Sequence, residues 1–536
     1  MRLRRRIPPS LVVLLAGLAQ AVSVAAPWNG QPLWWLQLLS LTALAWQLGR
    51  CAERELSWSS STWLDLDPRP AWQRGAWLGW LFACGWLAGS FWWLYISMHT
   101  YGGLAAPLAA LAVLALAAAL ALYYGAACAA FLMLFKARDL VGRSGAGLVF
   151  AALWTLAELA RGRWLTGFPW GAGGYAHVEG PLAGYAPWVG VYGIGAVAAW
   201  MAWQLPQLPQ SGWGRRLALA AVLGLPLAAQ YGGLSFSEPA GRQGVALLQG
   251  NIPQDEKFQP GTGVGDALRW YGEQLRVASA PLVVAPETAV PLLPRQMPPG
   301  YWAALQARYG RAEAGGRGGQ AALIGAPLGG EAGSGYTNSA VGLQPGASSP
   351  YRYDKHHLVP FGEFIPPGFR WFTSMMNIPL GDFDRGAVGQ RSMDWGGQRL
   401  APNVCYEDLF GEELGARFAD GASAPTAMVN LSNIAWFGNT VAIDQHLQIS
   451  RMRALEFERP MLRATNTGAT AIIDHRGRVT HSLPRHTRGV LIGEYEGRSG
   501  LTPYARWVSR LGLWPLWGLA LALVAAAMLA ARLRRR

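Results

Sequence analysis

Lysine is the rarest charged residue in this chain, and its scarcity suggests a chemical use for at least one copy. Lys136, Lys257 and Lys355 are the only lysines among 45 lysines and arginines. A lysine ammonium is compact, fits beside a carboxylate and a reacting carbonyl, and has a pKa that burial can move, whereas arginine stays charged. Lys355 is therefore a candidate for a task that a guanidinium does not perform.

A carboxylate and a lone thiol occupy similar positions in the sequence around Lys355. Glu287 follows an apolar run at 282–285, and Cys405 follows one at 400–404. A thiol near pH 7 is mostly protonated, so it needs a base to become a nucleophile and a cation to favour the thiolate and the developing oxyanion. These residues predict a Glu-Lys-Cys site with Glu287 as base, Lys355 as electrostatic and proton-positioning group, and Cys405 as nucleophile. Spacing alone leaves open that they are three unrelated surface residues.

The elements that would position these residues lie between 241 and 500. Short apolar, strand-like runs alternate there with amphipathic patterns, which predicts a layered α/β domain with its own core. Helices are expected at about 263–279, 299–311, 408–419 and 440–458. Cys405 would sit at a strand-to-helix turn, where the first free backbone N–H groups could help to hold an oxyanion.

The remainder of the chain has the composition of a membrane protein. Hydrophobic residues make up 51% and charged residues 14%. Eight apolar runs occupy 8–25, 31–48, 76–98, 104–135, 146–157, 181–204, 217–235 and 511–531. A bilayer core needs about 20 helical residues. The sequence therefore predicts about eight transmembrane helices, of which the run at 146–157 is the shortest and meets Glu158.

The basic residues indicate how these helices would be oriented. Arginines cluster at 2–6 and 532–536, and the loops at 49–75, 136–145 and 205–216 are basic, while those at 26–30 and 99–103 carry no Lys or Arg. The excess of basic residues in cytoplasmic loops places both termini in the cytoplasm and residues 236–510 outside it. Cleavage of the N-terminal run as a signal peptide remains an alternative, and it would not change the side of the large domain.

The predicted organisation has three parts. Residues 1–235 form a membrane domain with seven transmembrane helices, 236–500 a catalytic domain, and 501–536 the eighth helix with a basic cytoplasmic tail. The catalytic domain contains only one cysteine, so it cannot have an internal disulfide. The net charge of +14 reflects topology, because the arginines form no aromatic-basic patch typical of nucleic-acid binding.

Several motifs extend this interpretation to a family. They are APETA at 285–289, KHHLVPFGE at 355–363, CYE at 405–407, QGNIPQ at 249–254, AWFG at 435–438, RMRALE at 451–456 and LTGFPW at 165–170. The first three resemble the signatures of the carbon–nitrogen hydrolase (nitrilase) superfamily. With the other four and the predicted spans, nearly the whole chain resembles the bacterial apolipoprotein N-acyltransferase family.

The resemblance implies a periplasmic nitrilase-like αββα sandwich and a multi-pass protein of the bacterial inner membrane. It implies transfer of a fatty acyl group from a phospholipid to the α-amino group of the diacylglyceryl-cysteine of apolipoproteins, the final step of lipoprotein maturation. Cys405 would carry the acyl group as a thioester, and no metal or organic cofactor is needed. A membrane-tethered amidase with the same triad is the alternative; a transporter would need polar residues within its spans.

Four residues are expected to support the triad. Glu363 would orient Lys355 or be a buried structural acid, and Glu407 is equally open between the two roles. Tyr406 would lend its backbone N–H to the oxyanion, and Trp436 would contact a lipid chain or lie in the core. Ile434 stands where family members commonly have aspartate, so that carboxylate is absent or supplied elsewhere.

Three other features invite interpretation. The adjacent His356 and His357 lack further spaced ligands, so a metal site is not expected. The segment 364–383 is rich in aromatic and apolar residues and poor in charge. We expect it to lie against the membrane surface and admit acyl chains to Cys405, the alternative being packing on the domain's own core. Glu158 with Arg161 or Arg163 would form a structural pair or lie near a lipid head group.

Overall fold

The computed structural model describes residues 7–56, 69–135, 138–259, 261–311, 319–329, 335–373, 375 and 382–533. Lys136, the arginines at 2–6 and 534–536, and residues 376–381 of the predicted membrane-surface segment lie outside the described residues. The chain divides into two compact units. The helical unit comprises Met1–Trp92, Pro107–Leu234 and Leu513–Arg536, and the sheet unit comprises Trp93–Ala106 and Ser235–Gly512.

Each of the eight apolar runs overlaps a helix. These helices are α1 (Pro9–Val24), α2 (Trp34–Leu56), α3 (Ala71–Phe91), α5 (Ala106–Phe135), α6 (Arg138–Arg163), α7 (Ala186–Gln204), α8 (Trp213–Tyr231) and α15 (Trp514–Leu533). By length and composition, three stretches of the described residues could cross a membrane: Ala106–Leu134, Pro181–Gln210 and Trp514–Leu533. A bent pair, Ala71–Phe91 with Leu94–Tyr101, would be a fourth. The number eight therefore stays a prediction.

Glu158 and Arg161 lie buried on α6 within the helical unit. The Arg161 guanidinium donates to the Tyr124 hydroxyl at 2.8 Å and to the Trp170 carbonyl at 2.9 Å. The Glu158 carboxylate accepts from the Gly173 backbone N–H at 3.2 Å. Both side chains thus fix the loop that follows α6, and the expected pairing of Glu158 with Arg161 or Arg163 stays a prediction.

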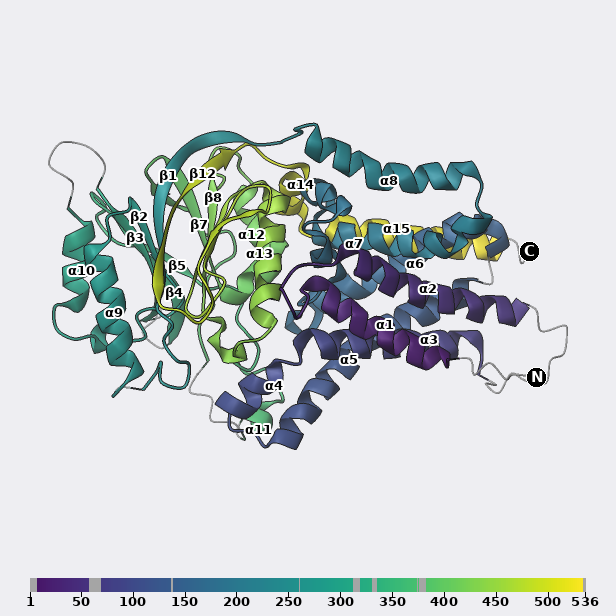
Figure 1. Cartoon of the computed structure of the whole chain (residues 1–536), viewed down its shortest axis with the longest axis horizontal. Helices are drawn as coiled ribbons and strands as arrows, with labels where there is room; N and C mark the ends of the chain where they lie inside the picture. Colours follow the sequence, from purple (N-terminus) through teal and green to yellow (C-terminus); the bar gives the residue numbers. More distant parts are fainter. Residues whose placement is uncertain are drawn as a thin grey trace. The chain divides into compact units, whose positions relative to one another are not determined.

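Within the described residues, the sheet unit contains two six-stranded sheets (Figure 1). The first has the order β12-β1-β2-β3-β4-β5, with strands Gly489–Ser499, Glu238–Gln249, Leu282–Ala285, Ala321–Gly329, Tyr336–Leu343 and Tyr351–Asp354. The second has the order β11-β10-β9-β8-β7-β6, with strands Val479–Ser482, Ala471–Ile473, Met461–Thr465, Ala427–Ser432, Gln398–Val404 and Met393–Trp395. Strands β1, β2 and β3 are mutually parallel, as are β7, β8 and β9.

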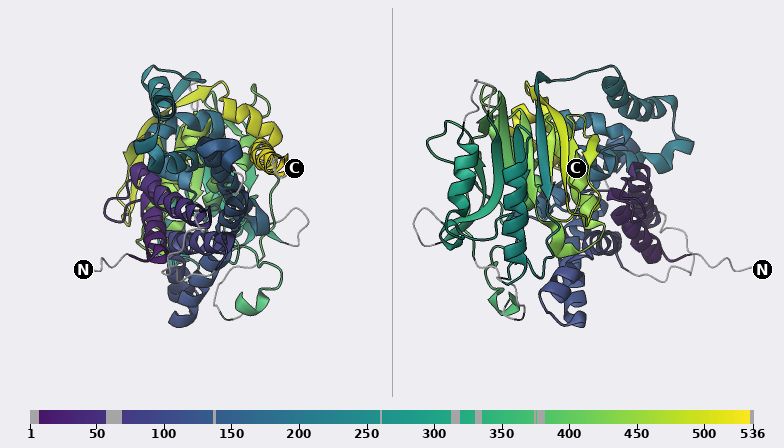
Figure 2. Two further views of the ribbon diagram at one scale, coloured as in Figure 1. Left: turned by 90° about the vertical axis from the view of Figure 1, so that its right-hand side faces the viewer. Right: turned by 60° about the vertical axis from the view of Figure 1, so that its left-hand side comes forward.

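The two sheets pack face to face through one apolar core. Val284 of the first sheet and Val404 and Val429 of the second belong to the same buried cluster. Figures 1 and 2 show α9 (Gly263–Val277) and α10 (Tyr301–Tyr309) outside the first sheet, with α12 (Gly411–Gly415) and α13 (Ala442–Phe457) outside the second. Because helices and the partner sheet cover both faces, β2 is buried at every position. The αββα sandwich expected from the sequence is confirmed.

Two local expectations differ from the structure. The helix predicted at 408–419 is broken into 3₁₀ turns around the short α12, because Phe410 has non-helical angles of φ −103° and ψ 78°. The apolar run at 76–98 does not continue as one helix either. Its end belongs to the sheet unit, where the Trp93 indole lies 4.2 Å from the Phe437 ring and donates to the Gln445 side chain at 3.1 Å.

Candidate active site

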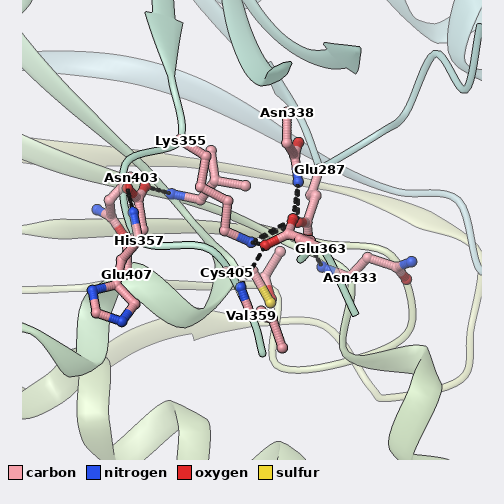
Figure 3. A network of polar contacts seen from close by, with 12 residues as sticks. Glu287, Asn338, Lys355, His357, Val359, Glu363, Asn403, Cys405, Glu407 and Asn433 are labelled. Carbon is pink, nitrogen blue, oxygen red and sulfur yellow. Dashed lines mark hydrogen bonds and ion pairs between the residues drawn. The ribbon is translucent and has the colours of Figure 1, made fainter. Parts of the chain in front are cut away.

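The three predicted residues each lie just beyond the carboxyl end of a strand. Glu287 comes two residues after β2, Lys355 directly after β5, and Cys405 directly after β7. Strands β2 and β5 run in the same direction and end at the same edge of the first sheet, and the packing of the two sheets brings the end of β7 beside them. Figure 3 shows Glu287, Lys355 and Cys405 converging with Glu363 on one point.

A network of two carboxylates, an ammonium and an amide forms the centre of the candidate site. The Lys355 ammonium lies 2.9 Å from the Glu363 carboxylate and 3.4 Å from that of Glu287. The Asn338 side-chain amide, which comes from β4, donates to both carboxylates at 2.7 Å. All four side chains are buried. Since one amide nitrogen donates to both acids, this arrangement fits two ionised carboxylates sharing one cation.

The backbone completes the coordination of these acids. The Asn433 N–H donates to Glu287 at 2.8 Å, and the Val359 N–H donates to Glu363 at 2.8 Å. The Asn338 carbonyl accepts from the Lys355 N–H at 2.8 Å. Glu363 therefore contacts the Lys355 ammonium while its own oxygens accept from these donors. Of the two carboxylates, Glu287 has the larger effect on the pKa of the Cys405 thiol, which makes it the candidate for proton exchange with that thiol.

Cys405 occupies a strained backbone position at the start of a 3₁₀ turn, Cys405–Leu409. Its φ of +52° lies in the left-handed region, which non-glycine residues rarely occupy. Its carbonyl is held at 3.2 Å by the Asn430 amide and lies 3.2 Å from the His446 imidazole. The Ser432 hydroxyl lies 3.4 Å from the thiol sulfur. These contacts fix the thiol at the edge where the carboxylates meet.

The electrostatics separate the roles of thiol and ammonium. Burial, and to a smaller degree the Glu287 charge, raise the pKa of the Cys405 thiol to about 12, although Lys355 lowers it. Burial also disfavours the charged form of Lys355, but the Glu363 and Glu287 carboxylates outweigh this and raise its pKa. The resting thiol is therefore protonated beside a permanent cation, so nucleophilic attack requires a base that removes the proton.

Glu407 connects the lysine loop to the cysteine turn. One carboxylate accepts from the backbone N–H groups of Val404, His356 and His357 at 2.6, 2.7 and 3.2 Å. The Tyr353 hydroxyl also contacts it at 2.8 Å. Because these donors flank both Lys355 and Cys405, Glu407 fixes the distance between them. These hydrogen bonds hold the two loops to one carboxylate, which is a positioning role.

The other supporting residues have less direct positions. The Tyr406 ring is buried 5.7 Å from the His357 ring and 5.3 Å from that of Phe410. The oxyanion role of its backbone N–H stays a prediction. Trp436 is half-buried on the 3₁₀ turn Ile434–Phe437, next to Asn433, and its ring packs 5.8 Å from Tyr101. Its contact with a lipid chain likewise stays a prediction.

The two adjacent histidines have partners within the protein. The His356 imidazole lies 2.7 Å from the Gly386 carbonyl, and that of His357 lies 3.0 Å from the Glu413 carboxylate. The His357 ring also stacks on Phe410 at 3.5 Å. These contacts give both rings a structural function.

Two family models match this chain in succession. Residues 16–204 match the apolipoprotein N-acyltransferase N-terminal domain, and residues 244–504 match the carbon-nitrogen hydrolase domain. An apolipoprotein N-acyltransferase of Verminephrobacter eiseniae is 59% identical over 93% of this chain and 92% of its own length. The chain belongs to the apolipoprotein N-acyltransferase family.

A second relative agrees with this assignment. An apolipoprotein N-acyltransferase of Ralstonia nicotianae is 47% identical over 88% of this chain and 86% of its own length. A solved structure of a CN-hydrolase superfamily protein from Xanthomonas campestris is 19% identical, with a TM-score of 0.35, over 51% of this chain and 96% of that one. The chain thus combines both domains of the apolipoprotein N-acyltransferase family.

Sequence reasoning missed several residues of the candidate site. Asn338 lies in a strand among small and apolar residues, Ser432 and Asn433 end another, and Lys257 follows the first strand of the domain. Asn338 and Lys257 are polar side chains that are nearly fully buried. For Asn338, Ser432 and Asn433, a polar residue within or next to an apolar run is the signal that could have found them, because burial of such a group requires a partner. Lys257 lies in a polar loop that carries no such signal.

We expect the substitution Glu407→Gln to disturb this apolipoprotein N-acyltransferase site without touching the triad. An amide in place of the carboxylate loses acceptor capacity toward donors on two loops and weakens the charge-assisted bonds. Unfolding free energy should fall by about 2–4 kcal/mol, which thermal unfolding in detergent would measure. The Glu494→Gln variant, which changes an exposed side chain, is a control for charge. Wild-type stability of Glu407→Gln would contradict the positioning role.

Proposed function

We propose that this chain acylates the α-amino group of the N-terminal diacylglyceryl-cysteine of apolipoproteins, with a membrane phospholipid as acyl donor. The observation that carries the proposal is a protonated, partly exposed Cys405 thiol beside the Glu287–Lys355–Glu363 network, within the domain that the family model matches. The proposed catalytic residues are Glu287, Lys355 and Cys405. Glu363, Tyr406, Glu407 and Trp436 support them.

The first half-reaction transfers the acyl group to sulfur. Glu287 removes the Cys405 proton as the sulfur attacks the ester carbonyl of the phospholipid, and the Lys355 ammonium stabilises the negative charge on the resulting oxyanion. When the intermediate collapses, the carbon–oxygen bond breaks and Glu287 returns its proton to the departing alkoxide. The products are a lysophospholipid and a Cys405 thioester.

The second half-reaction transfers the acyl group to nitrogen. The α-amine of the lipoprotein attacks the thioester carbonyl and Glu287 accepts a proton from that amine. The carbon–sulfur bond then breaks, and the proton returns to the thiolate, which restores Cys405. Lys355 stays an ammonium in both halves, because the two carboxylates hold its proton. The thioester divides one difficult lipid-to-amine transfer into two easier steps.

A membrane-tethered amidase of the same superfamily would use the same residues but resolve the thioester with water. The relatives reported above carry the acyltransferase name and match most of this chain, including the helical unit, so the comparisons do not favour this alternative.

Mass spectrometry of the Cys405 peptide tests the proposal. Purified full-length protein incubated with phospholipid vesicles should gain the mass of one acyl chain on that peptide and release lysophospholipid. Adding a diacylglyceryl-cysteine peptide should remove the adduct and yield the N-acylated peptide. An adduct that water removes equally fast would favour the amidase. Product without any adduct would exclude the covalent route.

The membrane arrangement is part of the proposal. Domains 1–235, 236–500 and 501–536 would provide seven helices, a periplasmic catalytic domain and an eighth helix of an inner-membrane protein. The support is the asymmetric distribution of basic residues and the family assignment. Labelling of single introduced cysteines in intact and permeabilised cells tests this arrangement. If an exposed position in 236–500 were labelled only after permeabilisation, the orientation would be the opposite of the proposed one.

An exposed aromatic group is the proposed contact with the lipid surface. The Trp371 side chain is 63% exposed, and its ring lies 5.9 Å from that of Phe372, which packs 5.7 Å from Phe361. We expect Trp371→Ser with Phe372→Ser to raise the KM for vesicle phospholipid by about tenfold, because burying apolar area in lipid favours binding. The exposed Ile492→Ser variant is the control. Unchanged kinetics would remove the contact.

A further inference from the structure

Lys257 is a buried ammonium that the proposed mechanism leaves without a role. Its side chain comes from the loop after β1 and is almost fully buried, with the residue 1% exposed. Its Nζ donates to the main-chain carbonyl of Glu287 at 3.1 Å. A buried lysine is costly unless acceptors and opposite charges compensate it. Here both come from the candidate active site.

The hydrogen bond from Lys257 falls on a strained turn. Thr288, which shares the peptide group of that carbonyl, has a φ of +46°, a conformation that β-branched residues avoid. Such strain persists only where surrounding contacts impose it. Holding the Glu287–Thr288 peptide fixes the direction in which the Glu287 side chain leaves the backbone.

The charges of the site point to a second role. Glu287 and Glu363 share the single Lys355 ammonium, which leaves one negative charge uncompensated. Lys257 is close enough to Glu287 and Cys405 for their charges to act on its own. When the thiol proton moves to Glu287, negative charge moves to sulfur, where a second cation favours it.

We infer that Lys257 is a positioning residue for Glu287 and the second cation of the active site, balancing the second carboxylate as the Cys405 thiolate forms. The inference rests on the proposed function, since it gives Lys257 a task in both half-reactions. It also explains why a lysine occupies this position in a chain that otherwise uses arginine, because a compact ammonium fits against a buried main-chain carbonyl.

The role predicts a specific pH dependence. Burial lowers the pKa of Lys257 to about 8, although the charges of Glu287 and Cys405 oppose the shift. Glu287 faces it from the turn after β2 and Cys405 from the end of β7, with Lys355 and Glu363 beyond Glu287. The second cation is thus present below pH 8 and lost above it, whereas arginine at this position would keep its charge.

The experiment compares full-length wild type, Lys257→Met, Lys257→Arg and a control, Gln259→Met, which alters an exposed side chain of the same loop. Acyl-enzyme formation from phospholipid vesicles is followed by mass between pH 6 and 10, and alkylation of the Cys405 peptide by iodoacetamide is measured at pH 7. Thermal unfolding in detergent confirms that each variant is folded.

We expect Lys257→Met to slow both reactions about tenfold at pH 7, since an opposite charge nearby shifts a thiol pKa by one unit or more. Wild-type acylation should decline above pH 8, and Lys257→Arg should lack that decline. Two outcomes would overturn the inference. One is a wild-type rate for Lys257→Met. The other is a Lys257→Arg variant that is as slow as Lys257→Met and keeps the wild-type decline above pH 8. If wild type forms no acyl-enzyme, the proposed function fails, while alkylation still decides the role of Lys257.

Discussion

Replacing Cys405 with alanine should eliminate both acyl-enzyme formation and lipoprotein N-acylation, with a rate loss of about 10⁴-fold or more. Among the described residues of the sheet unit, Cys405 carries the only thiol. The measurement is single-turnover acyl transfer from labelled phospholipid to a diacylglyceryl-cysteine peptide.

The matched control is Cys84→Ala, which removes a thiol from α3 in the helical unit. It should retain wild-type transfer, because Cys84 belongs to the helical unit and has no place in the proposed mechanism. Cys405→Ser tests nucleophile chemistry separately, since serine keeps the shape but is a far weaker acid. Residual transfer near wild-type speed in Cys405→Ala would disprove the thioester route.

The substitution Glu287→Gln should reduce transfer by about 10³-fold, within the range for loss of a general base. The amide keeps the size of the side chain but cannot accept the thiol proton. It would also turn an N–H group toward Asn338 or Asn433, which already donate to this position. Pre-steady-state measurement of lysophospholipid release would show the loss in the first half-reaction.

Glu363→Gln distinguishes loss of a base from loss of charge. It removes one carboxylate from the same ammonium but leaves the proposed proton acceptor in place, so we expect a smaller effect than for Glu287→Gln. If the two variants were equally impaired, or their order reversed, the assignment of Glu287 as base would have to be given up.

The sequence was most informative where a chemically reactive residue follows an apolar run that forms a strand. The run at 282–285 is β2, and its end delivers Glu287; the run at 400–404 ends β7, and its end delivers Cys405. A strand buried on both faces is a continuous apolar run, so its boundary is visible without a structure. The motifs around these boundaries also identified the family before any contact was known.

Other parts of the site depend on contacts that a linear pattern does not encode. Asn338 bridges Glu287 and Glu363 across 51 and 25 residues of sequence. The Asn433 backbone N–H reaches Glu287 across 146 residues, and any residue except proline could supply that group. The helix expected at 408–419 failed because the turn after Cys405 follows tertiary contacts of Glu407 and Asp408 rather than helical propensity.

The segment Trp93–Ala106 has a consequence for protein engineering. It is remote in sequence from the rest of the sheet unit, yet Trp93 is 1% exposed there, against Phe437 and Gln445. A recombinant fragment beginning at residue 235 would lack the segment 93–106. It would therefore expose an aromatic surface to solvent beside the turn that carries Asn433. A soluble version of the catalytic half would therefore have to be assembled from two pieces of chain, with 93–106 grafted on by a linker.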